Sequence, residues 1–184
     1  MFRSFVLAII AAFALTACEE PAPTRMGTDG KPLPRLYRIG ASDTGEIQFR
    51  MMDSVNVLRS ASGAPPVSMN AQLNAAAATH ARDMSVQNRP WHFGSDGSSP
   101  IDRAIRVGYQ GLLLGETISE TFETELETLS AWMAQPDTRA VILDPRASDF
   151  GFSWYQEQSG KIWWTMILGD GTTSNPDNFA QLGN

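Results

Sequence analysis

The sequence predicts a single α+β domain behind an N-terminal targeting segment. Three stretches repeat apolar residues at spacings of three and four, which is typical of helices that bury one face. Further along, two runs of alternating apolar residues flank Ser159-Gly160 and predict a β-hairpin. The chain has 184 residues, of which 42% are hydrophobic, so it can bury one sizeable core without a second domain or disulfides.

The charge balance argues against one class of partner. The formal net charge of the chain is −6 at pH 7, and an acidic surface repels a phosphate backbone. We therefore expect no binding to nucleic acid.

The first 17 residues have the features of a signal peptide. Arg3 supplies a positive charge, and residues 5–15 form an apolar run that is short for a membrane span. The run ends in Leu15-Thr16-Ala17-Cys18, which resembles the lipobox of bacterial lipoproteins, and Cys18 is the only cysteine. We expect acylation of Cys18 to anchor the protein in the bacterial cell envelope, facing the periplasm. Glu19, where inner-membrane retention uses aspartate, favours the outer membrane. The alternative is an ordinary secreted protein with a chance cysteine.

Residues 18–41 are predicted to hold the lipidated cysteine and a flexible tether. Four prolines lie among glycine and threonine there, and no apolar period is present. The folded domain is expected over residues 42–170, and residues 171–184 are expected to form a polar C-terminal tail.

The first half of this domain is predicted to be helical. One helix is expected to begin at Ser42 or Asp43 and to end near Gly63. A second helix, over residues 68–84, carries His80 on its apolar stripe. A lone histidine in such a place is more often a packed core residue than a ligand or a base.

The next stretch holds the other histidine and a carboxylate. His92 lies between two aromatic residues at the mouth of a Gly/Ser loop, a placement that favours a site more than a helix interior does. A short helix is expected over residues 100–107. Glu116 follows an apolar run, so its carboxylate is expected to pair, to hydrogen-bond or to take up a proton.

The remaining elements are another helix and the hairpin. This helix is expected to begin at Ser119 or Thr121 and to end at Pro136, with its acidic residues on a solvated face. The hairpin would pair residues 149–158 with residues 161–169. Its tryptophans are expected in the core, because aromatic pairs across strands are more often core than a ligand platform.

Several short motifs follow one another in a specific order. They are Val55-Asn56-Val57-Leu58-Arg59, residues 73–84, Trp91-His92, Arg103 with Gly108-Tyr109, Gly115-Glu116, Trp132-Met133 through Pro136 and Arg139 to Ile142-Leu143, and Phe150-Gly151. This ordered set resembles the CAP superfamily, which comprises cysteine-rich secretory proteins, antigen 5 and pathogenesis-related 1 proteins and is also called SCP-like. The resemblance covers about residues 44 to 169 and is strongest to the bacterial branch without disulfides.

The resemblance implies a three-layer α-β-α sandwich around an antiparallel sheet, with a large cleft on one side. In the family this cleft carries two histidines and acidic residues that hold zinc in several members. His92 matches the first histidine, and Glu116 matches the glutamate of the G-E-N motif, written G-E-T here. Two positions depart from the pattern. Thr138 stands in place of the second histidine, and Gln135 stands where other branches have a second glutamate.

These departures bear on metal binding. A zinc site takes at least three protein ligands, and His92 and Glu116 supply two. We therefore expect no cofactor, with zinc at His92 and Glu116 as the open alternative.

The sequence leads to the hypothesis of a lipid-anchored envelope protein that binds through its cleft. The cleft residues would be His92, Glu116, Gln135 and Thr138, and the ligand an apolar, lipid-like molecule or an envelope partner protein. We expect no enzyme activity, because the chain lacks a nucleophile elbow, an H-E-x-x-H helix and a phosphate-binding loop. The alternatives are a metal-assisted hydrolase that uses His92 and Glu116, and a passive envelope component with a degenerate cleft.

Overall fold

The computed structural model of the chain describes residue 28 and residues 36–121 and 123–174. The predicted signal peptide, Cys18, most of the tether and the tail from residue 175 lie outside these residues. Leu36 is the first residue of the compact unit that holds the domain. Within the described ranges, no helix combines the length and the apolar character needed to cross a bilayer.

The domain is built from five α-helices, a short 3-10 turn and four strands in the described ranges. In chain order the elements are η1 (Ala41–Asp43), α1 (Thr44–Ala61), β1 (Ser68–Met69), α2 (Ala71–Gln87), α3 (Pro100–Arg106), β2 (Gly111–Thr121), α4 (Glu125–Ala134), α5 (Pro136–Ile142), β3 (Asp149–Gln156) and β4 (Ile162–Ser174).

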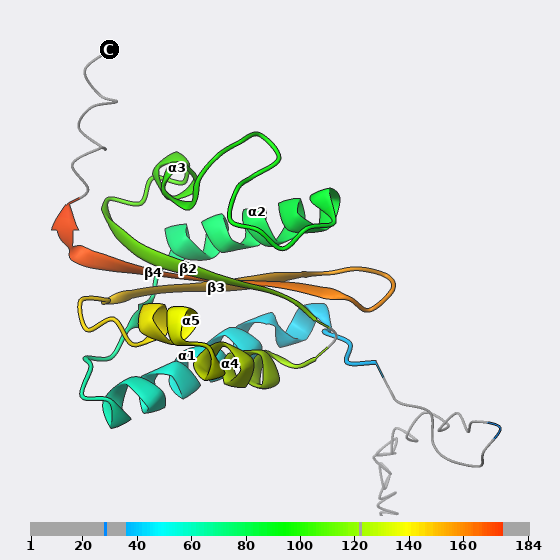
Figure 1. Cartoon of the computed structure of the whole chain (residues 1–184), viewed down its shortest axis with the longest axis horizontal. Helices are drawn as coiled ribbons and strands as arrows, with labels where there is room; N and C mark the ends of the chain where they lie inside the picture. The colour runs from blue at the N-terminus through cyan, green and yellow to red at the C-terminus, as the bar shows by residue number, and fades with distance from the viewer. Residues whose placement is uncertain (1–27, 29–35, 122, 175–184) are drawn as a thin grey trace, which may run out of the picture. The chain divides into compact units, whose positions relative to one another are not determined.

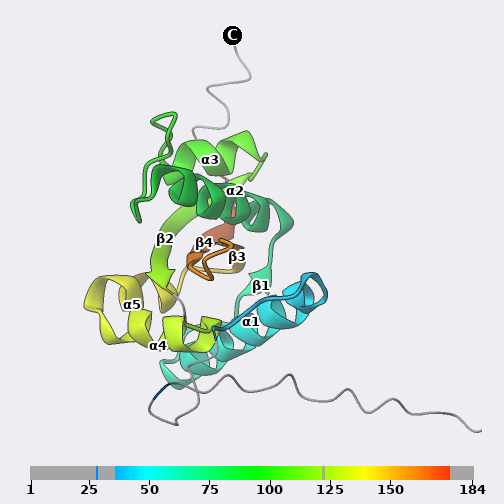
Figure 2. The same ribbon diagram turned by 90° about the vertical axis from the view of Figure 1, so that its right-hand side faces the viewer.

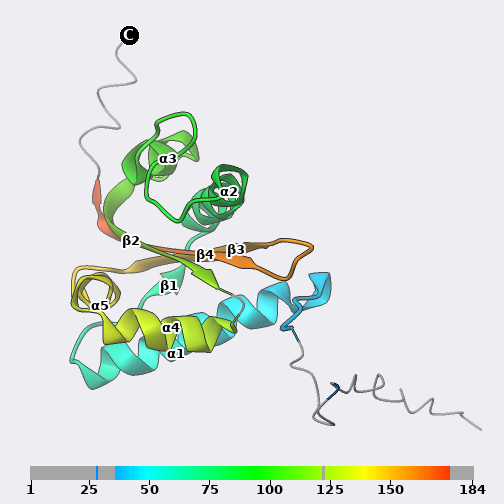
Figure 3. The ribbon, with the colours of Figure 1, turned by 45° about the vertical axis from the view of Figure 1, so that its right-hand side comes forward.

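These elements form three layers (Figure 1). The sheet in the middle has the strand order β1-β3-β4-β2, so β2 lies at one edge. Helices α2 and α3 cover one face of the sheet, and α1, α4 and α5 cover the other, as Figures 2 and 3 show from two further sides. The predicted three-layer α-β-α sandwich is confirmed.

The sheet differs in two details from the expectation. Strands β2, β4 and β3 are antiparallel neighbours, but β1 pairs with β3 in parallel through Ser68 and Met69. Strand β4 also runs on to Ser174, which pairs with Gly111. The tail predicted for residues 171–184 is therefore strand over its first four residues, because β2 offers a partner there.

The first three helices agree with their predicted positions, and the fourth does not. Asn70 caps α2 by accepting hydrogen bonds from two backbone N–H groups of the first turn. Helix α4 begins only after Thr124, whose side chain caps it, because Ser119 and Thr121 belong to β2. Pro136 does not simply end this helix. It occupies the first turn of α5. The backbone N–H groups of a first turn have no partner within the helix, so proline, which has no N–H, loses no hydrogen bond there.

The main core lies between the sheet and the layer of α1 and α4. Trp163 and Trp164 are fully buried in β4, which agrees with the core role predicted for the hairpin. Trp164 belongs to the main core and Trp163 packs on the α2 side of the sheet. The buried apolar side chains of the main core are Ile47, Met51, Val55, Val67, Leu129, Trp132, Ile142, Ala147, Phe150, Phe152, Ile162, Trp164, Met166 and Leu168.

A buried arginine ties α1 to the segment between α5 and β3. Arg59 is inaccessible to solvent and donates only to main-chain carbonyls. Its Nη1 bonds Ile142 O at 2.8 Å and Asp144 O at 3.0 Å, and its Nη2 bonds Ala147 O at 2.9 Å. Its Nε bonds Pro65 O at 2.8 Å. A single side chain thus bonds four main-chain carbonyls from two segments.

The domain begins earlier than the sequence predicts. Residues 37–39 were expected in the tether, yet the Tyr37 hydroxyl donates to Glu125 at 3.0 Å. The backbone of Tyr37 and Ile39 is held by the side-chain amide of Gln156, at 2.8 and 3.0 Å. These contacts join the entering chain to α4 and to the end of β3, so the boundary lies at Leu36 and not at residue 42.

Candidate functional site

The loop after α2 positions His92. Helix α2 stops at Asn88, which adopts the left-handed conformation with φ 48°. Trp91 then donates its indole N–H back to Gln87 Oε1 at 2.7 Å. The Arg89 guanidinium stacks on the same indole ring, 3.8 Å from its centre. These contacts fix the backbone immediately before His92.

Arg103 connects this loop to the sheet. Ser99 caps α3 in a capping box with Asp102, and the helix turns Arg103 inward, where it is 4% exposed. Its Nη1 donates to the carbonyls of His92 and Ser98, both at 3.0 Å. Its Nη2 donates to Glu116 Oε2 at 2.7 Å. One guanidinium therefore fixes the position of the loop that carries His92 and of the Glu116 carboxylate on β2.

The structure brings His92 and Glu116 into direct contact. His92 Nδ1 lies 2.9 Å from Glu116 Oε1, and the Glu116 side chain is 1% exposed. A carboxylate paired with arginine accepts hydrogen bonds, so Nδ1 of His92 is the donor in this contact. Half of the His92 side chain is exposed. This imidazole is oriented by a buried carboxylate through one of its two ring nitrogens.

His80 lies beside the same carboxylate. It is fully buried on α2, and its Nε2 donates to Trp91 O at 3.0 Å, which agrees with the packed, hydrogen-bonded role expected from the sequence. Nε2 is also 3.6 Å from Glu116 Oε1. Burial lowers the pKa of His80, and the nearby Glu116 charge opposes that effect only in part. His80 is therefore a neutral second imidazole in the cluster.

Gln135 and Thr138 lie at the corner between α4 and α5. Gln135 is exposed, and its carbonyl accepts from the backbone N–H of Arg139 at 3.0 Å. The Thr138 hydroxyl donates to the carbonyls of Trp132 and Gln135, so it closes the corner. Among the residues that the structure describes, no hydrogen bond joins Gln135 or Thr138 to His92 or Glu116.

The residues present do not fit a zinc site of the family type. The Glu116 oxygens are already bonded to His92 and Arg103, and a guanidinium at 2.7 Å disfavours a second cation. Residues 36–121 and 123–174 contain no group of three or more histidine, cysteine, aspartate or glutamate side chains arranged to hold a metal ion. The ligand set that zinc needs is thus incomplete in the described chain.

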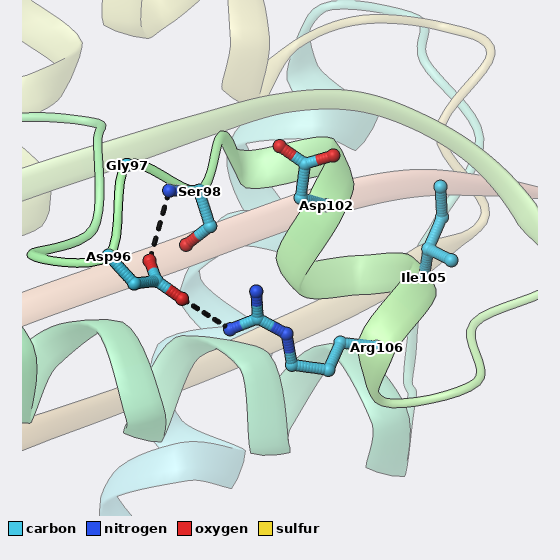
Figure 4. Close-up of a pocket in the computed structure, with 6 residues that line it drawn as sticks. All are labelled: Asp96, Gly97, Ser98, Asp102, Ile105 and Arg106. Carbon is cyan, nitrogen blue, oxygen red and sulfur yellow. Dashed lines mark hydrogen bonds and ion pairs between the residues drawn. The ribbon is translucent and has the colours of Figure 1, made fainter.

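A polar pocket of about 430 Å³ lies on the outer side of the His92 loop. Figure 4 shows its lining from the loop and from α3, with Asp96 accepting from the Ser98 N–H and from the Arg106 guanidinium. Asp102 is engaged in the α3 capping box. Both carboxylates of the lining are thus engaged in hydrogen bonds within the protein.

An apolar groove opens on the opposite layer, between α1 and α4. Its volume is about 420 Å³. Val57 and Leu126 on its rim are 69% and 40% exposed. It is lined by Ser54, Val57, Leu58, Leu126, Leu129, Ser130 and Met133.

Sequence reasoning missed Arg103 as a site residue and this groove as a binding surface. Arg103 reaches Glu116 over 13 positions, and nothing in the spacing indicates which way a helical arginine turns. The groove lies between α1, which ends at Ala61, and α4, which begins at Glu125, so no local pattern marks it. One signal for the groove was present in the sequence. Helix α1 has more apolar residues than one buried face requires, so some of them had to be exposed.

Comparisons with known proteins agree with this architecture. Residues 52–168 match the family model described as CAP, the cysteine-rich secretory protein family. The uncharacterized protein YkwD of Bacillus subtilis is 26% identical over 128 residues, which cover 70% of this chain and 49% of that protein. The chain therefore spans about half the length of this relative.

Two solved structures share the fold. One is an extracellular protein containing an SCP domain from Bacillus anthracis, with 19% identity and a TM-score of 0.64, covering 72% of this chain and 44% of that one. The other is an outer surface protein from Borrelia burgdorferi, with 16% identity and a TM-score of 0.64, covering 70% and 95%. Because the family model matches more than half of the sequence and the layers agree, this chain belongs to the CAP family of cysteine-rich secretory proteins.

Proposed function

We propose that this CAP-domain protein works outside the cytoplasm, anchored to the cell envelope through acylated Cys18, and binds an apolar, lipid-like molecule. The ligand would lie in the groove between α1 and α4. The observation that carries the proposal is the lining of that groove, which combines five apolar side chains with two serines and leaves Val57 69% exposed. Exposed apolar surface of this kind is costly unless it meets an apolar partner.

The shape of the groove favours a single acyl chain. Its volume of about 420 Å³ falls in the range of small-molecule sites, and its walls are formed by side chains of α1 and α4. Ser54 and Ser130 supply hydroxyls that can hydrogen-bond a polar head. The lining includes no titratable group, so we expect affinity to vary little between pH 6 and pH 8.

Titration with cis-parinaric acid, a fluorescent fatty acid, tests this proposal. We expect saturable binding that Val57→Asp weakens at least tenfold, because it places a carboxylate against the apolar chain. Val86→Asp is the matched control. Val86 is 76% exposed on α2, in the other layer, so its substitution should leave the affinity unchanged. Equal effects of the two substitutions, or non-saturable uptake, would contradict the proposal.

A second candidate function rests on the contact between His92 and Glu116. An exposed imidazole oriented by a buried carboxylate can act as a general base, which keeps the hydrolase alternative open. Calorimetric titration of zinc into the wild type and His92→Ala separates the candidates. We expect no tight binding, and fatty-acid binding that survives a chelator. Micromolar zinc affinity that disappears in His92→Ala would favour the hydrolase.

A further inference from the structure

The chain enters the domain at one end of the sandwich. Residues 36–40, the β3–β4 turn and the C-terminal end of α2 all lie at the right of Figure 1, and Figure 2 looks onto this end. Arg38 donates to the carbonyl of Gln158 in the turn at 2.8 Å. Lys161, just after the turn, donates to Asn88 Oδ1 at the end of α2 at 3.0 Å. The three segments therefore form one continuous surface.

We call this surface the entry face and define it by six side chains. Three are apolar and exposed, with 50% of Leu36, 76% of Val86 and 47% of Phe93 accessible to solvent. Phe93 lies beside the end of α2, because its carbonyl accepts from the Gln87 amide at 3.2 Å. Three are arginines, namely Arg38, Arg82 and Arg89. Apolar side chains interspersed with guanidinium groups are typical of surfaces that lie in the interface of a membrane.

The arginines of the entry face lack acidic partners. No carboxylate oxygen of the described chain lies within 4.0 Å of the charged nitrogens of Arg38, Arg82 or Arg89. Arg38 bonds only carbonyls, while Arg82 and Arg89 lie over the rings of Tyr155 and Trp91. In a protein with a net charge of −6, this end therefore presents three guanidinium groups that form no ion pair within the described chain.

The nearby carboxylates are bonded within the protein. Glu120 forms an ion pair with Lys161 at 2.7 Å. Glu157 accepts from the indole N–H of Trp163 at 2.7 Å and from the Ser85 hydroxyl at 2.9 Å. Both carboxylates are thus held toward partners within the protein, whereas the three arginines have no carboxylate partner in the described chain.

We propose that the entry face rests on a lipid bilayer that contains anionic headgroups. The arginines would bind headgroup phosphates, and Leu36, Val86 and Phe93 would enter the boundary between headgroups and acyl chains. The position of Leu36 supports this occupant, because the chain toward Cys18 leaves the domain from this face. The inference does not require a ligand in the groove between α1 and α4, and it does not require acylation.

Vesicle sedimentation of residues 19–184, without the predicted signal peptide and Cys18, tests the proposal in the absence of an anchor. We expect binding to vesicles of phosphatidylethanolamine and phosphatidylglycerol that decreases with added salt, and little binding to phosphatidylcholine alone. A basic side chain near an anionic surface contributes roughly a factor of five in partitioning. Arg89→Glu should therefore weaken binding by at least that factor, and Val86→Asp should weaken it by a similar amount.

Two substitutions away from the entry face serve as controls. Ile101→Asp changes an exposed isoleucine on α3, and Arg139→Glu reverses an exposed charge on α5. Both should leave partitioning unchanged. Equal binding to neutral vesicles, equal losses in all four variants, or no binding without acylation would each overturn the proposal.

Discussion

Arg103 and Glu116 form a buried ion pair at the centre of the candidate site, with Nη2 and Oε2 2.7 Å apart and both side chains at most 4% exposed. Such a pair contributes little net stability, because desolvation of the two charges offsets their attraction. Its importance lies in what happens when one partner is lost. The remaining charge would stay buried without compensation.

Replacing Arg103 should therefore destabilise the folded domain strongly. We expect Arg103→Met to lower the free energy of unfolding by about 3 to 5 kcal/mol, since it strands the Glu116 carboxylate. Denaturant unfolding followed by circular dichroism measures the loss. The double variant Arg103→Met/Glu116→Met should recover part of it, and a double variant that loses the sum of the two single effects would argue against coupling.

The two histidines should differ in their effect on stability. His80 is fully buried and hydrogen-bonded, so His80→Ala should lower the free energy of unfolding by about 2 kcal/mol or more. The half-exposed His92 makes one contact to Glu116, and His92→Ala should lower it by about 1 kcal/mol. Thermal unfolding of the two variants under identical conditions tests the order. The reverse order would show that the His92 loop, and not α2, carries the stabilising contacts.

Stability should decline in mild acid because of His80. Burial holds its pKa below the ordinary value of a histidine, so in mild acid the unfolded chain binds more protons than the folded one. The free energy of unfolding should then be greatest above about pH 6.5 and decrease as pH falls through that range. His80→Gln, which keeps a donor for Trp91 O but cannot titrate, should flatten this slope. Unchanged slopes would assign the acid sensitivity to other groups.

Arg59 should not tolerate lysine. An ammonium has three donors on one nitrogen and cannot reach four carbonyls spread over two segments. We expect Arg59→Lys to lower the free energy of unfolding by about 3 kcal/mol, because it leaves buried carbonyls unpaired. Urea unfolding gives the value, and Arg139→Lys on the surface provides the comparison. A loss below about 1 kcal/mol would mean that water replaces the guanidinium.

Gly151 should resist any side chain. A Cβ at this position would lie 2.5 Å from Leu73 Cβ, where α2 packs on β3. Gly151→Ala should therefore force the helix away from the sheet and lower the free energy of unfolding by about 1 to 3 kcal/mol. Gly45→Ala in α1, where no atom lies within 4 Å of the added Cβ, should instead be neutral or stabilising. Similar melting temperatures for the two variants would contradict this packing.

The sequence predicted those parts of the fold that depend on local pattern. The buried stripe of α1 and the tryptophan-rich hairpin follow from periods of 3.6 and 2. The error at the start of α4 arose because serine and threonine are good helix caps, although Ser119 and Thr121 both belong to β2. Only the pairing of β2 with β4, which no local window contains, decides between the two roles.

The candidate site was predictable in part for a similar reason. The resemblance to the CAP superfamily supplied His92 and Glu116, and the structure places them 2.9 Å apart. It also grouped Gln135 and Thr138 with them, but the hydroxyl of Thr138 is used to close the corner between α4 and α5. Whether a helical residue such as Arg103 or His80 turns toward Glu116 depends on how α2 and α3 dock on the sheet, which is a property of the whole domain.

The four hydrogen bonds that Arg59 donates to main-chain carbonyls have an evolutionary consequence. Its acceptors are the carbonyls of residues 65, 142, 144 and 147, which every amino acid provides. These bonds place no demand on the side chains of the connecting segment, so its exposed positions 145 and 146 can vary as long as the backbone keeps its path. Mutational tolerance should be high at these exposed positions and very low at Arg59.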